Sequence, residues 1–434
     1  MTRWANWSGL ETAHPERVVT PASADEIVAE VRRARDGGRT AKMVGTGHSF
    51  TAISAPEHTM LVPGSLTGIL AVDHEAMTVT AAAGTRLKHL NVALERLGLS
   101  LHNMGDIAEQ TLAGAISTGT HGTGGVAAGL GAQVVGLELV TGTGELVRAT
   151  PSENPDVLEM ARVGLGALGV LTSITFAVEP LFLLEATEEP MSWDRATSSF
   201  DELVAEHHHV DMYWFPHTDR MLTKRDIRLD ASLDEARPVS RFRRWLDDDF
   251  LSNTVFGLET AALNRWPRAI PRANNLAATM LSPRTYSDVA HRVFVSERRV
   301  VFREMEYAVP REAGLTALKE ARAALEGSDL AISFPVEVRV APADDIPLST
   351  ASGRDSLYLA FHTHRRADHT AYFGLMEQVM RAHGGRPHWG KVHTCDAGDL
   401  AELYPRFADF LAMRDRLDPD RVFANAYLRR VLGD

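Results

Sequence analysis

Two glycine-rich stretches decide the fold of this chain: Val44-Gly45-Thr46-Gly47-His48-Ser49-Phe50 and Ala113-Gly114-Ala115-Ile116-Ser117-Thr118-Gly119-Thr120-His121-Gly122-Thr123-Gly124. Glycine lets a backbone come close to a bound anion, because it lacks a Cβ and turns freely. The hydroxyl side chains between the glycines can donate hydrogen bonds to the same anion. We therefore expect the two stretches to hold one ligand between them.

The composition restricts the class of protein. The chain has 434 residues and a formal net charge of −12, so its length predicts two or three domains and its charge argues against nucleic acid as a partner. A single cysteine, Cys395, excludes an intrachain disulfide framework and a multi-cysteine metal site. No apolar stretch approaches the roughly 20 residues that span a bilayer, and the first residues lack a signal-peptide core. We expect a soluble, cytoplasmic protein without a metal ion.

The first 180 residues mix short strands with helices. Ser23 and Glu26 have the spacing of a capping box, which predicts a helix ending near residues 36–38. A second helix is expected over residues 87–97, with Gly98 at its end. Strands are expected over residues 42–44, 59–62, 69–72, 77–82 and 170–176, with a hairpin over 134–147 that turns at 142–144. Because the strands are short and irregularly spaced, the pattern favours an α+β domain over a regular βαβ array.

One run in this region matches the G-x-G-x-x-G dinucleotide fingerprint, namely Gly164-Leu165-Gly166-Ala167-Leu168-Gly169. That motif binds a pyrophosphate only where it follows a strand and opens a helix. Here a helical pattern precedes the run and the strand over 170–176 follows it, so the context is reversed. We interpret the run as a helix-to-strand turn rather than a Rossmann site.

Two charged or metal-like patterns occur between residues 181 and 330. Arg241-Phe242-Arg243-Arg244-Trp245 stands beside Asp247-Asp248-Asp249, whose negative charge offsets it, so the run predicts a solvated helix rather than a nucleic-acid patch. His207-His208-His209 could suggest a metal site, but three consecutive side chains cannot point the same way from a helix or a strand. The histidine run favours a polar surface turn.

Strict alternation marks the stretch Phe334-Pro335-Val336-Glu337-Val338-Arg339-Val340. The alternation places Glu337 and Arg339 on one face of a strand and the valines on the other. Such a pair either forms a surface salt bridge or lines a pocket that grips a polyhydroxylated substrate. A second strand over 356–364 places His362 and His364 on one face.

The C-terminal segment contains a rigid turn and a helical pattern. The run His388-Trp389-Gly390-Lys391 places Lys391 in a turn, where it is either an exposed residue or a fixed positive charge. Apolar residues at helical spacing between Leu403 and Leu417 predict one helix.

Five of these motifs occur in the order seen in aldonolactone oxidases. They are Gly45-Thr46-Gly47-His48-Ser49, Asn103-Met104-Gly105, Ser117-Thr118-Gly119-Thr120-His121-Gly122, Glu337-Val338-Arg339 and His388-Trp389-Gly390-Lys391. The chain therefore resembles the vanillyl-alcohol oxidase flavoprotein superfamily. Within it, the branch of L-gulono-/D-arabinono-1,4-lactone oxidases and alditol oxidases fits best. The similarity covers nearly the whole chain and is weakest between about residues 185 and 330.

The resemblance implies an α+β fold in two parts. An FAD domain of two α+β subdomains would comprise residues 1–180, a substrate cap on an antiparallel sheet would comprise residues 181–385, and residues 386–434 would return to the FAD domain. The FAD would be attached covalently through His48, since neutral imidazole is a competent nucleophile. Cofactor contacts are implied at Val44, Gly45, Thr46, Gly47, His48, Ser49, Phe50, Gly105, Asp106, Thr111, Gly114, Ser117, Thr118, Gly119, His121, Gly122, Gly169 and Val170.

The resemblance also implies a reaction. A secondary alcohol of an aldono-1,4-lactone would give a hydride to flavin N5, with O₂ as the electron acceptor. Arg339 would polarise the hydroxyl with Glu337 beside it, and Lys391 would lie near the flavin N1–C2=O edge. Substrate contacts are implied at Asp106, Glu337, Arg339, His362, His388 and Lys391.

Other activities compete with this interpretation. Gly105 leaves room for O₂ and favours an oxidase, whereas a dehydrogenase would reduce a quinone or cytochrome. Asp106 and His362 replace residues that alditol oxidases use for substrate, so they favour a lactone over a linear sugar alcohol. A non-catalytic flavin carrier would not need the Glu337, Arg339 and Lys391 set.

Overall fold

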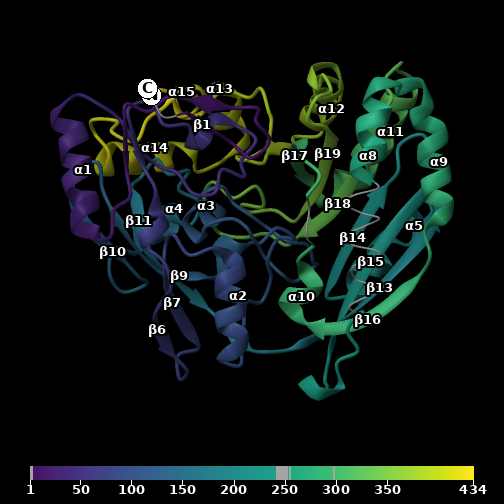
Figure 1. The fold of residues 1–434 in the computed structure, drawn as a ribbon, viewed down its shortest axis with the longest axis horizontal. Coiled ribbons are helices and arrows are strands. Elements are labelled where there is room, and N and C mark those ends of the chain that lie inside the picture. Colours follow the sequence, from purple (N-terminus) through teal and green to yellow (C-terminus); the bar gives the residue numbers. More distant parts are fainter. Residues whose placement is uncertain (1–2, 241–252, 254–255, 297–298) are drawn as a thin grey trace.

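The computed structural model describes residues 3–240, 253, 256–296 and 299–434. Within these residues the strands form an eight-stranded, a five-stranded and a three-stranded sheet, together with two two-stranded pairs. Figure 1 shows the N-terminal elements and the C-terminal helices on one side, and the large sheet with its own helices on the other. The α+β class predicted from the sequence is confirmed.

The N-terminal part contains two sheets and two short pairs. In the three-stranded sheet, β3 (Arg17–Val19), β5 (Thr59–Leu61) and β4 (Ala41–Met43) run parallel. The five-stranded sheet is antiparallel, in the order β10 (Leu146–Ala149), β9 (Val134–Val140), β11 (Val170–Ala177), β7 (Thr78–Ala82) and β6 (Ile69–Asp73). The pairs are β1 (Trp4–Ala5) with β2 (Thr12–Ala13), and β8 (Leu99–Ser100) with β12 (Glu179–Pro180). The hairpin expected over residues 134–147 is confirmed as β9 and β10.

Four helices belong to this part among the described residues: α1 (Ala24–Asp36), α2 (Leu87–Arg96), α3 (Leu112–Ser117) and α4 (Pro155–Ala161). The side chain of Ser23 accepts a hydrogen bond from the Glu26 N–H at 3.3 Å, as the capping pattern predicts. Gly98 follows α2 with a φ of +72°, a conformation that favours glycine. The run over residues 164–169 joins α4 to β11, which confirms the helix-to-strand turn.

The eight-stranded sheet is antiparallel throughout and forms the second part of the molecule. Its order is β16 (Arg284–Val289), β13 (Leu183–Ser192), β15 (Arg220–Leu229), β14 (His209–Trp214), β18 (Val336–Ala341), β19 (Ser356–His364), β17 (Phe302–Pro310) and β20 (Arg386–Pro387). One face packs against α5 (Trp193–Ser198), α6 (Phe200–Glu206), α11 (Arg311–Glu326) and α12 (Thr370–Ala382). Three further helices are α8 (Phe256–Arg265), α9 (Ile270–Met280) and α10 (Ala290–Phe294).

Strand β18 confirms the alternation predicted from the sequence. Val336, Val338 and Val340 pack into the apolar core beneath the helices, and none is more than 2% exposed. Glu337 and Arg339 lie on the opposite face and are also buried, because that face is covered by the N-terminal part. The pair is therefore not a surface salt bridge.

The interpretation of the histidine run is wrong for His209. This residue begins β14 and is only 1% exposed, and its Nε2 lies 3.2 Å from Asn103 Oδ1. Burial lowers the pKa of His209 well below its usual value. Pairing of β14 into the large sheet buries this position, which the local sequence could not show. The basic–aromatic run over residues 241–245 lies outside the described residues.

The C-terminal segment returns to the N-terminal part through three helices, α13 (Ala397–Leu403), α14 (Phe407–Leu417) and α15 (Ala426–Leu432). The single helix expected between Leu403 and Leu417 is two helices, because Pro405 stands between α13 and α14 and cannot continue a helix. The side chain of Asn425 donates to the carbonyls of Ala52, Ile53 and Ala55. None of the helices that the structure describes is long and apolar enough to cross a membrane.

Replacing Asn425 with alanine should destabilise the protein by about 2–4 kcal/mol, because it removes a helix cap and leaves buried carbonyls without a donor. Asn425 is 1% exposed, and its Oδ1 accepts from the Leu428 N–H at the start of α15. Urea unfolding measures the loss. Asn275→Ala is the control, since Asn275 makes two similar hydrogen bonds at an exposed position and should cost less than about 1 kcal/mol. Equal losses for the two variants would contradict the argument.

Candidate functional site

A cavity lies between the two glycine-rich stretches. The residues singled out from the sequence that line it are Gly45, Thr46, Gly47, His48, Ser49, Thr111, Gly114, Ser117, Thr118, Gly169 and Val170. Its walls combine backbone groups of glycines with serine and threonine hydroxyls. The cavity therefore fits a long ligand that carries phosphate and hydroxyl groups.

The two stretches approach each other too closely for a side chain at position 45. A Cβ there would lie 2.3 Å from Thr111 Oγ1, which itself accepts from the Gly114 N–H at the start of α3. Gly47 has a φ of +71°, so a side chain would be strained there as well. Glycine at these positions lets both loops present backbone groups to one ligand.

Other residues singled out from the sequence lie outside this cavity. Val44 is completely buried, and Phe50 stacks on Phe302 at a ring-centroid distance of 5.6 Å. Gly119 and His121 contact a separate small cavity, while Asp106 and Gly122 line another that Arg339 also reaches. A Cβ on Gly105 would lie 3.1 Å from the carbonyl oxygen of His121.

His48 lines the large cavity and stacks on Trp7, with 5.6 Å between ring centroids. Burial lowers the pKa of His48, and this effect outweighs the attraction of Glu109. The imidazole is therefore neutral near pH 7, which is the form that acts as a nucleophile.

Lys42 is a wall residue that the sequence analysis did not single out. Its Nζ donates to the carbonyls of Gly166 at 2.9 Å and Phe423 at 3.2 Å. Burial lowers the pKa of Lys42 to about 7, although Asp418 opposes the shift. Its position on β4, directly before the first glycine-rich stretch, was the feature that could have pointed to it from the sequence. However, the residues that accept its hydrogen bonds lie more than a hundred positions away.

Arg339 is held by carboxylates from three segments of the chain. Its Nε donates to Asp211 Oδ1 at 2.9 Å, and its Nη2 donates to Glu337 Oε1 at 2.7 Å and lies 3.4 Å from Asp106 Oδ1. Burial acts to lower the pKa of Arg339, but Glu337, Asp106 and Asp211 raise it well above its usual value. The guanidinium is thus a permanent charge in a water-poor site. Asp211 was missed, although it alternates with apolar neighbours in β14.

Lys391 forms an ion pair with Glu304, which lies 3.5 Å from His362 Nε2. Burial acts to raise the pKa of Glu304, but Lys391 and His362 lower it to about 2. The structure thus brings together two of the residues implied for substrate, Lys391 and His362, through a carboxylate that sequence reasoning missed. Glu304 and Glu306 alternate with apolar residues along β17, which was the available signal.

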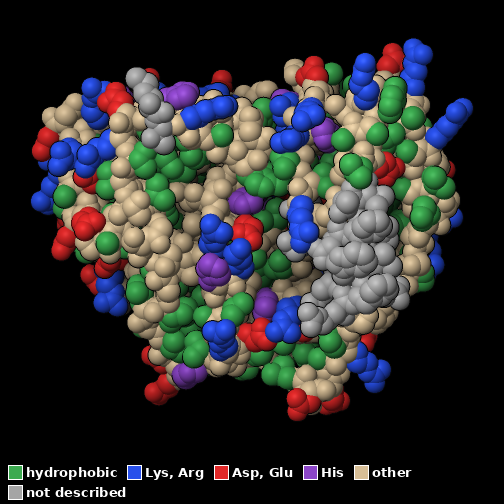
Figure 2. Space-filling view, in the orientation of Figure 1, with side chains coloured by type: hydrophobic (Ala, Val, Ile, Leu, Met, Phe, Trp, Pro, Cys, Tyr) green, Lys and Arg blue, Asp and Glu red, His purple; other side chains and the backbone are tan. Residues whose placement is uncertain are grey.

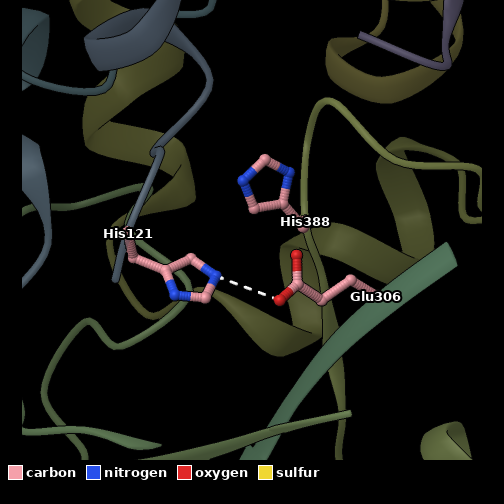
Figure 3. A group of neighbouring side chains, drawn as sticks. All are labelled: His121, Glu306 and His388. Atoms are coloured by element: carbon pink, nitrogen blue, oxygen red, sulfur yellow. Dashed lines mark ion pairs between the residues drawn. The ribbon is translucent and has the colours of Figure 1, made fainter. Parts of the chain in front are cut away.

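His121, Glu306 and His388 converge from three elements, as Figure 3 shows. One potential ligand atom of each lies within 4.8 Å of the others, so a metal ion has to be considered. However, His388 Nδ1 accepts from the Gly390 N–H at 3.1 Å, so its Nε2 carries the proton and has no lone pair to offer. His121 Nδ1 bonds the Gly122 carbonyl and its Nε2 lies 3.2 Å from Glu306. These bonds favour a cluster joined by protons over a metal centre.

Charged and histidine side chains gather around the hollow between the two parts of the molecule, as Figure 2 shows. The polar face of the large sheet carries the buried side chains of Glu304, Glu306, Glu337 and Arg339. The arrangement can bind a neutral, hydroxylated molecule and hold fixed charges against it.

Comparison with known proteins gives this arrangement a context. Residues 174–431 match the family model described as D-arabinono-1,4-lactone oxidase, and residues 15–150 match the model described as FAD binding domain. The cavity between the glycine-rich stretches fits FAD, because both stretches lie within that domain.

Similar proteins are found along the whole chain. L-gulono-1,4-lactone dehydrogenase of Mycobacterium tuberculosis is 40% identical over 99% of both chains. L-gulonolactone oxidase of Bos taurus is 32% identical over 99% of this chain and 98% of its own. Among solved structures, cholesterol oxidase of Brevibacterium sterolicum matches with a TM-score of 0.82 at 18% identity, covering 99% of this chain and 96% of its own. The last match shows the fold alone.

The Lys42→Met variant should have a stability that changes differently with pH from that of the wild type. Between pH 7 and pH 10.5 the unfolded chain binds a proton at Lys42 that the folded protein does not bind, so wild-type stability rises with pH in this window. The slope relative to Lys42→Met is at most about 1.4 kcal/mol per pH unit. Urea unfolding at several pH values measures it, and parallel profiles would refute the assignment.

Proposed function

The chain belongs to the family of D-arabinono-1,4-lactone oxidases, and we propose that it uses FAD to oxidise a secondary alcohol of an aldono-1,4-lactone. The observation that carries this proposal is the buried Glu337–Arg339 pair on the sheet face that looks toward the FAD-binding part. A protein that only carried electrons would have no need for a buried guanidinium beside its cofactor. The proposal therefore assigns this pair to the substrate.

FAD would lie in the cavity between the glycine-rich stretches, with Thr46, Ser49, Ser117 and Thr118 as hydroxyl donors. His48 lines the same cavity and would carry the covalent bond to the 8α carbon of the flavin. Its neutral, half-buried imidazole supports that role. When bound, the flavin supplies the two-electron acceptor for the reaction.

The substrate hydroxyl would be held by Arg339. A guanidinium N–H can donate to the hydroxyl oxygen and stabilise the negative charge that develops as the proton leaves. Glu337 and Asp211 accept two of its N–H groups and fix its plane, so the charge needs little reorganisation. Lys391 holds a second positive charge, which would compensate the negative charge that reduction adds to the cofactor.

The substrate class follows from Asp106 and His362. Asp106 contributes a carboxylate next to Arg339, and His362 pairs with Glu304. Both stand where alditol oxidases carry uncharged hydroxyl side chains, which supports a lactone over a linear sugar alcohol.

The electron acceptor has two candidates. Gly105 carries no side chain, and the resemblance to aldonolactone oxidases implies that this position faces the flavin, where room for O₂ supports an oxidase. A dehydrogenase is the second candidate, because the Mycobacterium tuberculosis relative at 40% identity carries that name.

The covalent bond is tested by precipitating the protein with acid. We expect the yellow colour to stay with the wild-type pellet and to move entirely to the supernatant for His48→Ala. His74→Ala, at an exposed position, is the control and should behave as the wild type. Wild-type protein that releases all its flavin would disprove the attachment.

The activity is tested by anaerobic mixing with L-gulono- and D-arabinono-1,4-lactone and with xylitol, followed by admission of air. We expect the lactones to bleach the flavin and xylitol to leave it oxidised, and air to restore the colour if the protein is an oxidase. Bleaching by xylitol alone would favour the alditol oxidase.

The Lys391→Met variant should slow this bleaching by about a hundredfold, the usual value of one preorganised charge. The covalent bond should remain intact, which acid precipitation checks. An unchanged rate of bleaching would remove Lys391 from the mechanism.

A further inference from the structure

A second polar cavity lies beside Arg339 toward β14 and β15, whereas the ion pair of Lys391 and Glu304 lies toward β17 on the other side of β18. Asp106 and Arg339 form one end of it, and Lys224 and Asp226 from β15 contribute to another wall. None of the motifs singled out in the sequence pointed to β15. Arg339 lines this cavity and also belongs to the ion cluster described above.

Asp226 provides the evidence that this cavity binds a ligand. It is 1% exposed, and its Oδ1 has no hydrogen-bond partner among the described residues. Burial raises the pKa of Asp226 to about 7 in spite of the nearby Lys224, as expected for a carboxyl that lacks donors. A buried polar atom without a partner is costly, so a donor delivered by a ligand would be favourable.

The remaining walls identify the chemistry of that ligand. Lys224 donates to the Val293 carbonyl at 2.6 Å and, with Arg339, offsets the acids Asp211 and Asp226. Because both signs of charge are present, the cavity suits a neutral molecule with several hydroxyl groups better than an ion. Met104 and Phe294 add apolar surface for its carbon atoms.

We propose that this cavity is a subsite for the exocyclic hydroxyl-bearing chain of the lactone, with Asp226 as the acceptor of one of its hydroxyl groups. The inference rests on the proposed function, which places the lactone ring against Arg339. The substituent on the ring carbon remote from the carbonyl then reaches past Arg339 toward β15. Asp226 therefore selects for the length of this substituent.

The test uses three lactones with the same ring configuration and different exocyclic lengths: L-gulono-, D-lyxono- and L-erythrono-1,4-lactone, with six, five and four carbons. The four-carbon compound has no exocyclic carbon and cannot reach the subsite. At pH 8, above the pKa of about 7 of Asp226, we expect Asp226→Asn to lower kcat/KM for the six-carbon lactone by about tenfold, chiefly through KM, because a neutral amide oxygen is a weaker acceptor than a carboxylate. The four-carbon lactone should be oxidised at the wild-type rate.

Asp288→Asn is the matched control, because Asp288 is a buried aspartate of the same sheet that does not line the cavity. It should leave the ratio of six-carbon to four-carbon kcat/KM unchanged. Equal losses on all three lactones, or no loss on any, would show that Asp226 is structural or that the cavity holds only water, and would overturn the inference. A wild-type protein that oxidises none of the three would instead refute the proposed function.

Discussion

The charge of Arg339 is the constraint on which the arrangement of the two parts depends. A guanidinium placed between two packed parts of a protein loses its hydration, and the loss is repaid only when carboxylates meet it in good geometry. The carboxylates come from three segments: Asp106 from the N-terminal part, Asp211 from β14 and Glu337 from β18 itself. A shift of the N-terminal part against the sheet would take Asp106 away from Arg339, whereas Asp211 and Glu337 lie in the same sheet as Arg339 and would stay paired with it. Asp106 is therefore the contact through which this ion cluster joins the N-terminal part to the large sheet.

The second glycine-rich stretch links the cavity that it lines to the strands β14 and β18 of the large sheet. Its start lines the FAD cavity, and a few residues later the Gly124 N–H donates to the Val340 carbonyl. Between them, Thr123 Oγ1 donates to the Val210 carbonyl on β14 and accepts from the Val340 N–H. One short segment thus touches the cofactor site and both strands that carry Asp211 and Arg339. One backbone hydrogen bond and two hydrogen bonds of the buried Thr123 side chain hold this segment against the two strands.

The sequence patterns predicted those features of the fold that depend on interactions between neighbouring residues. The Ser23 cap, the hairpin of β9 and β10, and the two faces of β18 follow from interactions between residues close in sequence. The partners of buried charges could not be predicted in this way. Asp211 meets Arg339 across 128 positions of sequence, and burial of His209 depends on β14 joining the large sheet. Without knowledge of the pairing, an aspartate or histidine in a short apolar run is indistinguishable from a surface residue.

The pairing of buried charges also explains why β17 can carry two glutamates on one face. Glu304 and Glu306 share one face of the strand, and two buried carboxylates so close would repel each other. Each is offset by its own partners, Lys391 and His362 for the first and His121 for the second. The ion pair with Glu304 fixes the position of the Lys391 side chain through a contact within the protein itself. A charge whose position is fixed before the reaction begins needs no rearrangement when electrons move. A site that excludes water therefore stabilises a transition state more effectively than water does, because water molecules have to reorient.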